Sequence, residues 1–335
     1  MPRAPGHDPG HDTPPAGMSW ADYVEHLVST CGSLAAVAER IASMRGFDDD
    51  VGSIERALRR LRTRGQREGG TWGARALSVF GLPAAADARA RWMGAYHSRF
   101  NDLPVPLCKD LVRLWDRPPV SEAPASRLWL ALAHATCAAR ADRLDEARTH
   151  LERAHASIAA APAEAIAERL LALAFLASRD APGTTGDLLD EVERLLERPM
   201  PDHDRACLHA RWIDQRAYEV NHGRGESGRP DPAAAEALYR QIPTSRAPAF
   251  ALFRRANGLA YARWKQGAHE EAAGLAREAV RHAGDGGHLR ARAMALKMLA
   301  RVVGGEEGAA AEARALSIVM SLEDEALRLR FVQHA

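Results

Sequence analysis

Residues 258–280 read GLAYARWKQGAHEEAAGLAREAV. Within them, Ala272, Ala276 and Ala279 recur at i, i+4 and i+7, the spacing that places side chains on one face of an α-helix. Alanine is the best helix former, and its small side chain lets two helices approach closely. Gly267 precedes this face and is placed to close a turn after an earlier amphipathic segment. The stretch therefore predicts two helices that are joined by a tight turn and pack through small residues.

Other parts of the chain carry the same alanine face. Its anchor positions are Ala147, Ala235, Ala272 and Ala309. The last two intervals are both 37 residues, and the first interval, 88 residues, leaves room for a further helix pair over 163–179 and 187–198. The last copy of the face is expected to use Ala309, Ala313 and Leu316. Helix pairs with such faces cannot bury them alone, so the periodicity predicts that they stack into an α-solenoid.

This pattern resembles the tetratricopeptide repeat (TPR), a family in which two antiparallel helices alternate. That family has a Leu-Gly pair in its first helix and small residues at fixed positions of its second helix. Leu259, Ala260 and Ala272 fit the pattern, whereas Arg263 stands where the first helix usually carries Tyr. The resemblance implies a right-handed α-solenoid of about five helix pairs over 126–335. A generic α-solenoid is the alternative.

The composition predicts an all-α fold and excludes several classes of protein. The chain has 67 Ala and only 6% aromatic residues, so a large β-sheet is not expected. Its 45 Lys and Arg residues nearly balance 44 Asp and Glu residues, for a net charge of +1. This balance excludes a uniformly basic nucleic-acid coat and an acidic solvating tail.

The cysteines and the hydropathy predict a cytoplasmic protein with no membrane segment. Residues 1–17 hold no apolar run, so we expect a disordered tail and no signal peptide. The longest nearly apolar stretch, 170–177, is far shorter than the roughly 20 residues that a membrane span needs. Four cysteines lie far apart without a CxxC motif, as reduced thiols do: Cys31, Cys108, Cys137 and Cys207.

Residues 18–82 are expected to form a small helical bundle that resembles a helix-turn-helix domain in shape. Helices are predicted over 19–29, 33–42 and 51–64, and the breaks between them are short. A Pro-punctuated connector, 83–125, then separates this bundle from the solenoid.

The third predicted helix is basic on the side opposite its apolar stripe. Its candidate nucleic-acid contacts are Arg56, Arg59, Arg60 and Arg67. An exposed basic helix after a tight turn is typical of a major-groove reader, whose charges neutralise phosphates. The alternative is a solvated surface on which Glu55 and Arg59 pair at i and i+4.

The inner wall of a TPR-like solenoid would offer a groove for a peptide. Candidate wall residues on the first helices are Arg211, Gln215, Tyr218, Asn257, Tyr261 and Trp264. Asn or Arg side chains can hold a peptide backbone or a carboxylate, and aromatic rings can supply apolar pockets. Packing of the three aromatic residues between repeats is the alternative.

No pattern predicts catalysis or a cofactor. Residues 65–73, GQREGGTWG, lack the GxxxxGK[ST] spacing of a phosphate-binding loop, and we interpret them as a connecting turn with Thr71 as a helix cap. His97, Ser98 and Asp102 lie close in sequence among aromatic residues, but no oxyanion loop accompanies them. We therefore expect a packing contact there and not a catalytic site.

No complete metal site is predicted either. His203 and Cys207 share one helix face, but the sequence offers no evident third ligand. The GHDPGHD segment at 6–12 could bind a metal loosely, although a disordered linker explains it more simply.

Three functions are compatible with these features. We expect a non-enzymatic adaptor that holds a protein or peptide in the solenoid groove. The first alternative is a ligand- or peptide-controlled transcription regulator that binds DNA, because the domain order is similar to that of peptide-sensing regulators from Gram-positive bacteria. The chain does not match the characteristic N-terminal motif of those regulators. The second alternative is an accessory subunit of a defence or secretion complex.

Overall fold

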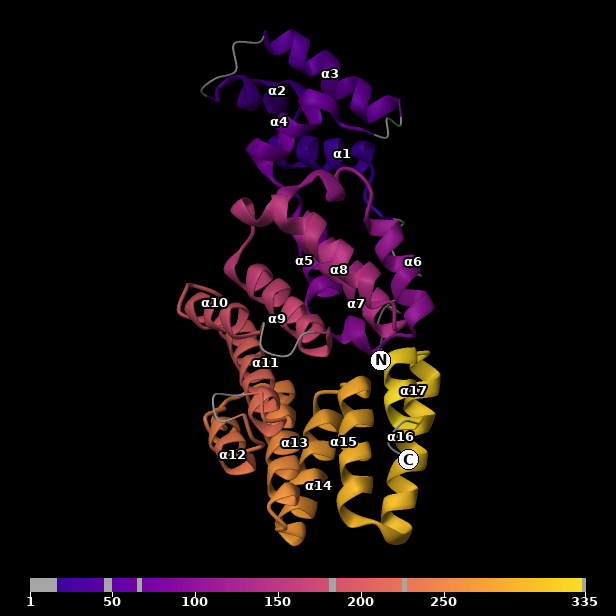
Figure 1. Cartoon of the computed structure of the whole chain (residues 1–335). Helices are drawn as coiled ribbons and strands as arrows, with labels where there is room; N and C mark the ends of the chain where they lie inside the picture. Colours follow the sequence, from indigo (N-terminus) through magenta and orange to yellow (C-terminus); the bar gives the residue numbers. More distant parts are fainter. Residues whose placement is uncertain (1–16, 45–49, 65–67, 181–184, 225–227, 333–335) are drawn as a thin grey trace, which may run out of the picture. The chain divides into compact units, whose positions relative to one another are not determined.

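The computed structural model describes residues 17–44, 50–64, 68–180, 185–224 and 228–332. Over these residues the chain forms seventeen α-helices and three short 3-10 helices, and no strand is present (Figure 1). The expectation of an all-α fold is therefore confirmed. In the described part of the chain, each helix is either too short or too polar to cross a bilayer.

The chain divides into two compact units. The first comprises 1–90 with 113–126, and the second comprises 91–112 with 127–335. The residues that we expected to form a connector, 83–125, are thus shared between both units.

Four helices make up most of the first unit: α1 (Trp20–Cys31), α2 (Leu34–Ala42), α3 (Val51–Thr63) and α4 (Gly70–Phe80). Ser19, Ser33 and Asp50 precede the first three helices, and each side chain accepts a hydrogen bond from a backbone N–H of the first turn. The expected cap at Thr71 is wrong, because α4 begins one residue earlier and no side chain caps it.

The core of the first unit forms around Trp20 and Tyr23, which are almost completely buried together with Ile54 and Leu58 of α3. A Cβ atom at Gly69 would lie 2.1 Å from the Trp20 ring, so this close approach requires glycine. The described end of the Gly-rich segment before α4 therefore contributes to packing.

The remaining α-helices follow in chain order: α5 (Ala84–Gly94), α6 (Val105–Trp115), α7 (Pro124–Arg140), α8 (Leu144–Arg153), α9 (Ala163–Asp180), α10 (Gly186–Leu196), α11 (Asp202–Asn221), α12 (Pro232–Arg240), α13 (Ala249–Lys265), α14 (His269–Asp285), α15 (Leu289–Val303), α16 (Gly305–Leu322) and α17 (Glu325–Val332). The 3-10 helices are η1 (Arg99–Asp102), η2 (Val120–Glu122) and η3 (Ala154–Ala160).

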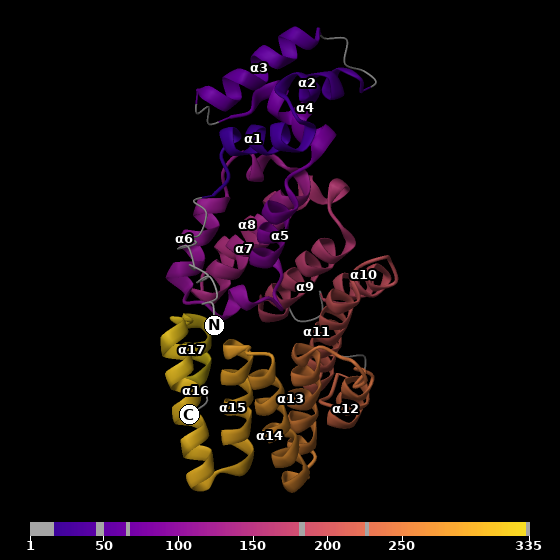
Figure 2. The same ribbon diagram turned by 180° about the vertical axis from the view of Figure 1, so that it is seen from behind.

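From α8 to α17, consecutive helices pack against each other, and Figures 1 and 2 show α13, α14 and α15 side by side. The turn between α13 and α14 uses Gly267 at φ +82°, a left-handed conformation that favours glycine. Ala272, Ala276 and Ala279 of α14 are completely buried. The helix pair predicted from 258–280 is therefore confirmed.

The expected face of α16 is wrong. Ala309, Ala313 and Leu316 are exposed, and the buried face of this helix instead consists of Gly308, Ala311, Ala315, Val319 and Leu322. Alanines occur on several sides of α16, so the alanine spacing alone could not decide which face is buried. The second 37-residue interval therefore does not join equivalent positions.

Candidate functional site

A cavity of about 800 Å³ lies within the second unit. Most of its wall comes from alternate helices of the chain, α7, α9, α11, α13, α15 and α17. The residues that face it recur with helical spacing; on α15 they include Arg290, Met294, Lys297 and Arg301. On α11, α13 and α15 the residues that face the cavity are thus mostly polar.

The apolar residues of the same helices hold them in place. On α11, Ala210, Ile213 and Ala217 are fully buried, whereas Arg211 and Gln215 between them line the cavity. This alternation follows from the 3.6-residue period of the helix. The core of the second unit therefore determines which polar side chains reach the cavity.

Five of the six groove residues suggested by the sequence line this cavity: Arg211, Gln215, Tyr218, Asn257 and Tyr261. The sixth, Trp264, is not part of the lining. Its ring lies 5.8 Å from the Tyr261 ring, and the Arg301 guanidinium lies 5.6 Å from its centroid. Both aromatic rings also pack against the core around α15 and α16, so the packing alternative applies to them as well.

The amide of Asn257 is notable among these residues. Its Oδ1 is buried and accepts no hydrogen bond from any residue that the structure describes. By contrast, the Gln215 side chain donates to the Leu171 carbonyl at 2.9 Å, and Arg211 pairs with Glu168. A buried acceptor without a donor is costly, so Asn257 is available for a hydrogen bond from a ligand.

The wall of the cavity carries a large excess of positive charge. Nine Lys and Arg residues line it: Arg140, Arg179, Arg211, Arg224, Arg254, Arg290, Lys297, Arg301 and Arg330. Two carboxylates, Asp214 and Glu219, also line it, and three more pair with lining cations from behind: Glu168, Glu312 and Asp324. Nine cations thus face five carboxylates.

Three of these cations form no ion pair with any carboxylate among the described residues: Arg179, Arg301 and Arg330. The other six are held by carboxylates, as for Arg254, whose Nη1 lies 2.5 Å from Asp214 Oδ2. The unpaired cations give the cavity a capacity for anions that its own side chains do not use.

Tyr96 lies among the arginines of this cavity. Its hydroxyl accepts hydrogen bonds from Arg290 Nη1 at 2.5 Å and Arg254 Nη2 at 3.4 Å, and the Arg211 guanidinium covers its ring at 4.2 Å. Burial raises the pKa of Tyr96, but the surrounding guanidinium groups, of which Arg290 acts most strongly, lower this pKa to about 8. The shift reports a strongly positive local potential.

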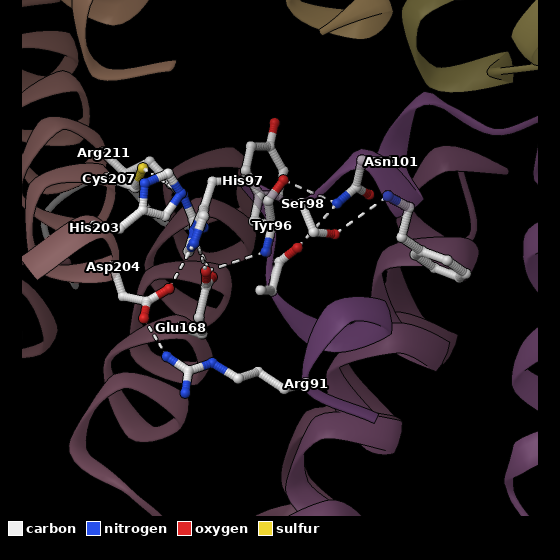
Figure 3. Close-up of polar contacts among 12 residues, drawn as sticks. Arg91, Tyr96, His97, Ser98, Asn101, Glu168, His203, Asp204, Cys207 and Arg211 are labelled. Atoms are coloured by element: carbon white, nitrogen blue, oxygen red, sulfur yellow. Dashed lines mark hydrogen bonds and ion pairs between the residues drawn. The ribbon is translucent and has the colours of Figure 1, made fainter. Parts of the chain in front are cut away.

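A cluster of buried charges adjoins Tyr96, and its side chains converge from separate segments (Figure 3). His97 Nε2 lies 2.9 Å from Asp204 Oδ1 on α11, and His97 Nδ1 lies 3.3 Å from Glu168 Oε1 on α9. Arg91 donates a hydrogen bond to the other oxygen of Asp204, and Arg211 donates one to the other oxygen of Glu168. Burial lowers the pKa of His97, but the bond to Asp204 and the nearby Glu168 carboxylate outweigh this effect and raise it.

The structure separates the three residues that the sequence grouped as His97, Ser98 and Asp102. Ser98 accepts from the Phe100 backbone at the start of η1, and Asp102 accepts from the Arg290 backbone at 3.0 Å. His97 is bonded to Asp204 instead. These residues therefore contact different partners, as expected for packing.

The basic helix of the first unit, α3, is partly neutralised by its own neighbours. Arg59 pairs with Glu55 at 2.6 Å, the i,i+4 contact that the sequence predicts. Arg56 is exposed, 4.0 Å from Asp50. Arg60 is exposed and pairs with no carboxylate in the described part of the chain. Arg67 lies outside the described residues.

Comparison with known protein families, with curated proteins and with solved structures finds no match to this chain.

Proposed function

We propose that this chain is a non-enzymatic adaptor that binds an acidic segment of a partner protein in the cavity of its second unit. The observation that carries this proposal is the excess of positive charge on the cavity wall. A binding function of this kind suits a cytoplasmic protein, as the sequence predicts.

The arrangement of helices supports a TPR-like solenoid as the scaffold. From α7 to α17, the odd-numbered helices supply most of the cavity wall. Alternation of this kind is expected when helix pairs stack and their first helices form the inner surface. We propose a right-handed solenoid of about five pairs on this basis.

The side chains of the wall suit carboxylates. A guanidinium group binds a carboxylate through two parallel N–H bonds, and several such groups can follow an acidic peptide. Arg301 and Arg330 are free of internal carboxylate partners among the described residues, and Asn257 offers an unused acceptor for a peptide N–H. Tyr218, which is 42% exposed, adds an aromatic ring to the same lining.

Binding of labelled peptides tests this proposal. Fluorescence anisotropy should show that a decapeptide of alternating Glu and Gly binds the full chain, whereas its Gln-Gly counterpart does not. Arg301→Ala and Arg330→Ala should each weaken binding by about tenfold, the loss expected for one charged hydrogen bond. Arg314→Ala is the matched control, because Arg314 is exposed on α16 and does not line the cavity. Equal binding of both peptides would contradict the proposal.

A transcription regulator that binds DNA through α3 is the second candidate. The exposed positions of Arg56 and Arg60 favour it, since neither guanidinium is held in a close ion pair among the described residues. An electrophoretic mobility shift on mixed DNA fragments should then fall steeply with salt. Arg56→Glu together with Arg60→Glu should abolish the shift, and Arg314→Glu should preserve it. An unchanged shift in the double variant would exclude α3 as the contact.

A further inference from the structure

A group of nitrogen and sulfur side chains lies beside the buried charges of Figure 3. His203 and Cys207 project from one face of α11, and His203 Nε2 lies 3.9 Å from Cys207 Sγ. The His97 ring packs edge-on against the His203 ring, with 5.5 Å between centroids. One ligand atom from each of the three residues lies within 4.8 Å of the others. The third ligand that the sequence did not offer is thus supplied by the segment before η1.

The distances approach those of a metal site. Around a tetrahedral Zn²⁺ ion, a histidine nitrogen and a cysteine sulfur lie about 3.5 Å apart, given bonds of about 2.0 and 2.3 Å. The 3.9 Å between His203 and Cys207 therefore needs only a small contraction. Both residues belong to one helix turn, so side-chain rotation is sufficient for it.

The surroundings of His97 fit a metal ligand. This side chain is 7% exposed, and its buried Nδ1 makes no hydrogen bond with the residues that the structure describes. Its Nε2 is held by Asp204, which Arg91 holds in turn. A carboxylate that fixes one nitrogen of an imidazole and leaves the other for a metal is the usual support of a metal-binding histidine.

The charge of the cluster also suits a cation. Three carboxylates, Glu164, Glu168 and Asp204, lie there against two guanidinium groups, Arg91 and Arg211, so the cluster has one excess negative charge when His97 is neutral, the form that binds a metal. Glu168 Oε1 lies 3.3 Å from His97 Nδ1, and the carboxylate is almost completely buried. Glu168 does not join the three ligand residues, because its Oε1 accepts from the Tyr96 backbone N–H and Arg211 holds its other oxygen.

We propose that His97, His203 and Cys207 form a binding site for Zn²⁺. His203 is exposed and gives the ion a route from solvent, whereas His97 and Cys207 are buried. The three protein ligands would fasten the segment before η1 to α11 and leave the fourth tetrahedral position to a water molecule. The site is independent of the proposed binding of an acidic partner.

Cobalt spectroscopy tests the site. The full chain, after treatment with a chelator, is titrated with Co²⁺ and the bound Co²⁺ is then displaced with Zn²⁺. We expect one equivalent of Co²⁺ to produce the visible bands of tetrahedral coordination and a sulfur-to-cobalt charge-transfer band. Cys207→Ser should remove the charge-transfer band, and His203→Gln should lower the affinity at least tenfold.

Two controls make the result decisive. His209→Gln, on the same helix but outside the cluster, should bind Co²⁺ as the wild type does. A full-chain variant with His7→Gln and His11→Gln should also retain one equivalent, because the N-terminal GHDPGHD segment is not the site. Thermal melting with and without Zn²⁺ gives a second readout, and Zn²⁺ should raise Tm in the wild type but not in His203→Gln. Absence of Co²⁺ binding, or a charge-transfer band that survives Cys207→Ser, would overturn the proposal.

Discussion

At the scale of single residues, the second unit depends on carboxylates that are buried between guanidinium groups. Asp324, which is 1% exposed, accepts hydrogen bonds from Arg140 Nε at 2.9 Å and Arg290 Nε at 2.8 Å. The backbone N–H of Leu327 donates a third, at 3.0 Å. One carboxylate thereby links α7 and α15 to the start of α17.

Replacing this carboxylate should destabilise the protein strongly. Asp324→Asn leaves two buried guanidinium groups without their shared counter-ion, a change that typically costs about 3–5 kcal/mol. Urea unfolding at pH 7 measures the loss. Asp145→Asn is the matched control, because the Asp145 side chain is 99% exposed and its removal should change stability by no more than about 0.5 kcal/mol.

The effect of Asp324→Asn should also depend on pH. Burial raises the pKa of Asp324, but Arg290 and Arg140 outweigh it and hold this pKa below its usual range. A carboxyl group whose pKa is lower in the folded than in the unfolded state stabilises the fold at pH values above the unfolded-state pKa of about 3.9. That stability is lost as the pH falls through the folded-state pKa. The stability difference between wild type and variant should therefore shrink in acid. A difference that stays constant from pH 7 to acid would contradict this role.

The sequence alone could not predict these contacts between distant residues. Arg140 and Asp324 are 184 positions apart, and His97 and Asp204 are 107 apart. Periodicity reports which face a residue occupies on its own helix, but it carries no information on which distant helix faces it. The third metal ligand was missed for the same reason, because His97 and Cys207 come together only in the fold.

At the scale of helices, the alanine pattern predicted some elements well and one face wrongly. The expected helices 163–179 and 187–198 correspond to α9 and α10 within one or two residues. In α14 the alanine face is the buried face, because the charged residues of this helix all lie off it. In α16 consecutive alanines at 309–311 fit more than one face, so tertiary packing decided the outcome.

The corrected face of α16 yields a prediction. Ala315 is fully buried, so Ala315→Leu adds volume to a packed interface and should lower the free energy of unfolding by about 1–3 kcal/mol. Ala313→Leu, on the exposed side of the same helix, should have little effect. Thermal or urea unfolding of both variants compares the two faces. A larger loss of unfolding free energy in Ala313→Leu would show that the face predicted from the alanine spacing is the buried one.

At the scale of the whole chain, the second unit brings cations from many helices to one cavity. The polar residues of α11 and α13 could be predicted because Arg211, Gln215 and Asn257 interrupt apolar faces at helical spacing. The same signal exists in α15, where Arg290, Lys297 and Arg301 recur. These charges meet in one place because of how the helices stack, which periodicity does not predict. The net charge of +1 gives no sign of this local excess of positive charge.

The central claim is that this positive cavity binds an acidic segment, and a charge reversal tests it most directly. Anisotropy titrations would compare wild type with the Arg301→Glu, Arg330→Glu double variant, using the Glu-Gly peptide and a Lys-Gly peptide. We predict that the double variant binds the acidic peptide at least a hundredfold more weakly and gains affinity for the basic one. Unchanged affinity for the acidic peptide, in a variant that melts as the wild type does, would contradict the claim.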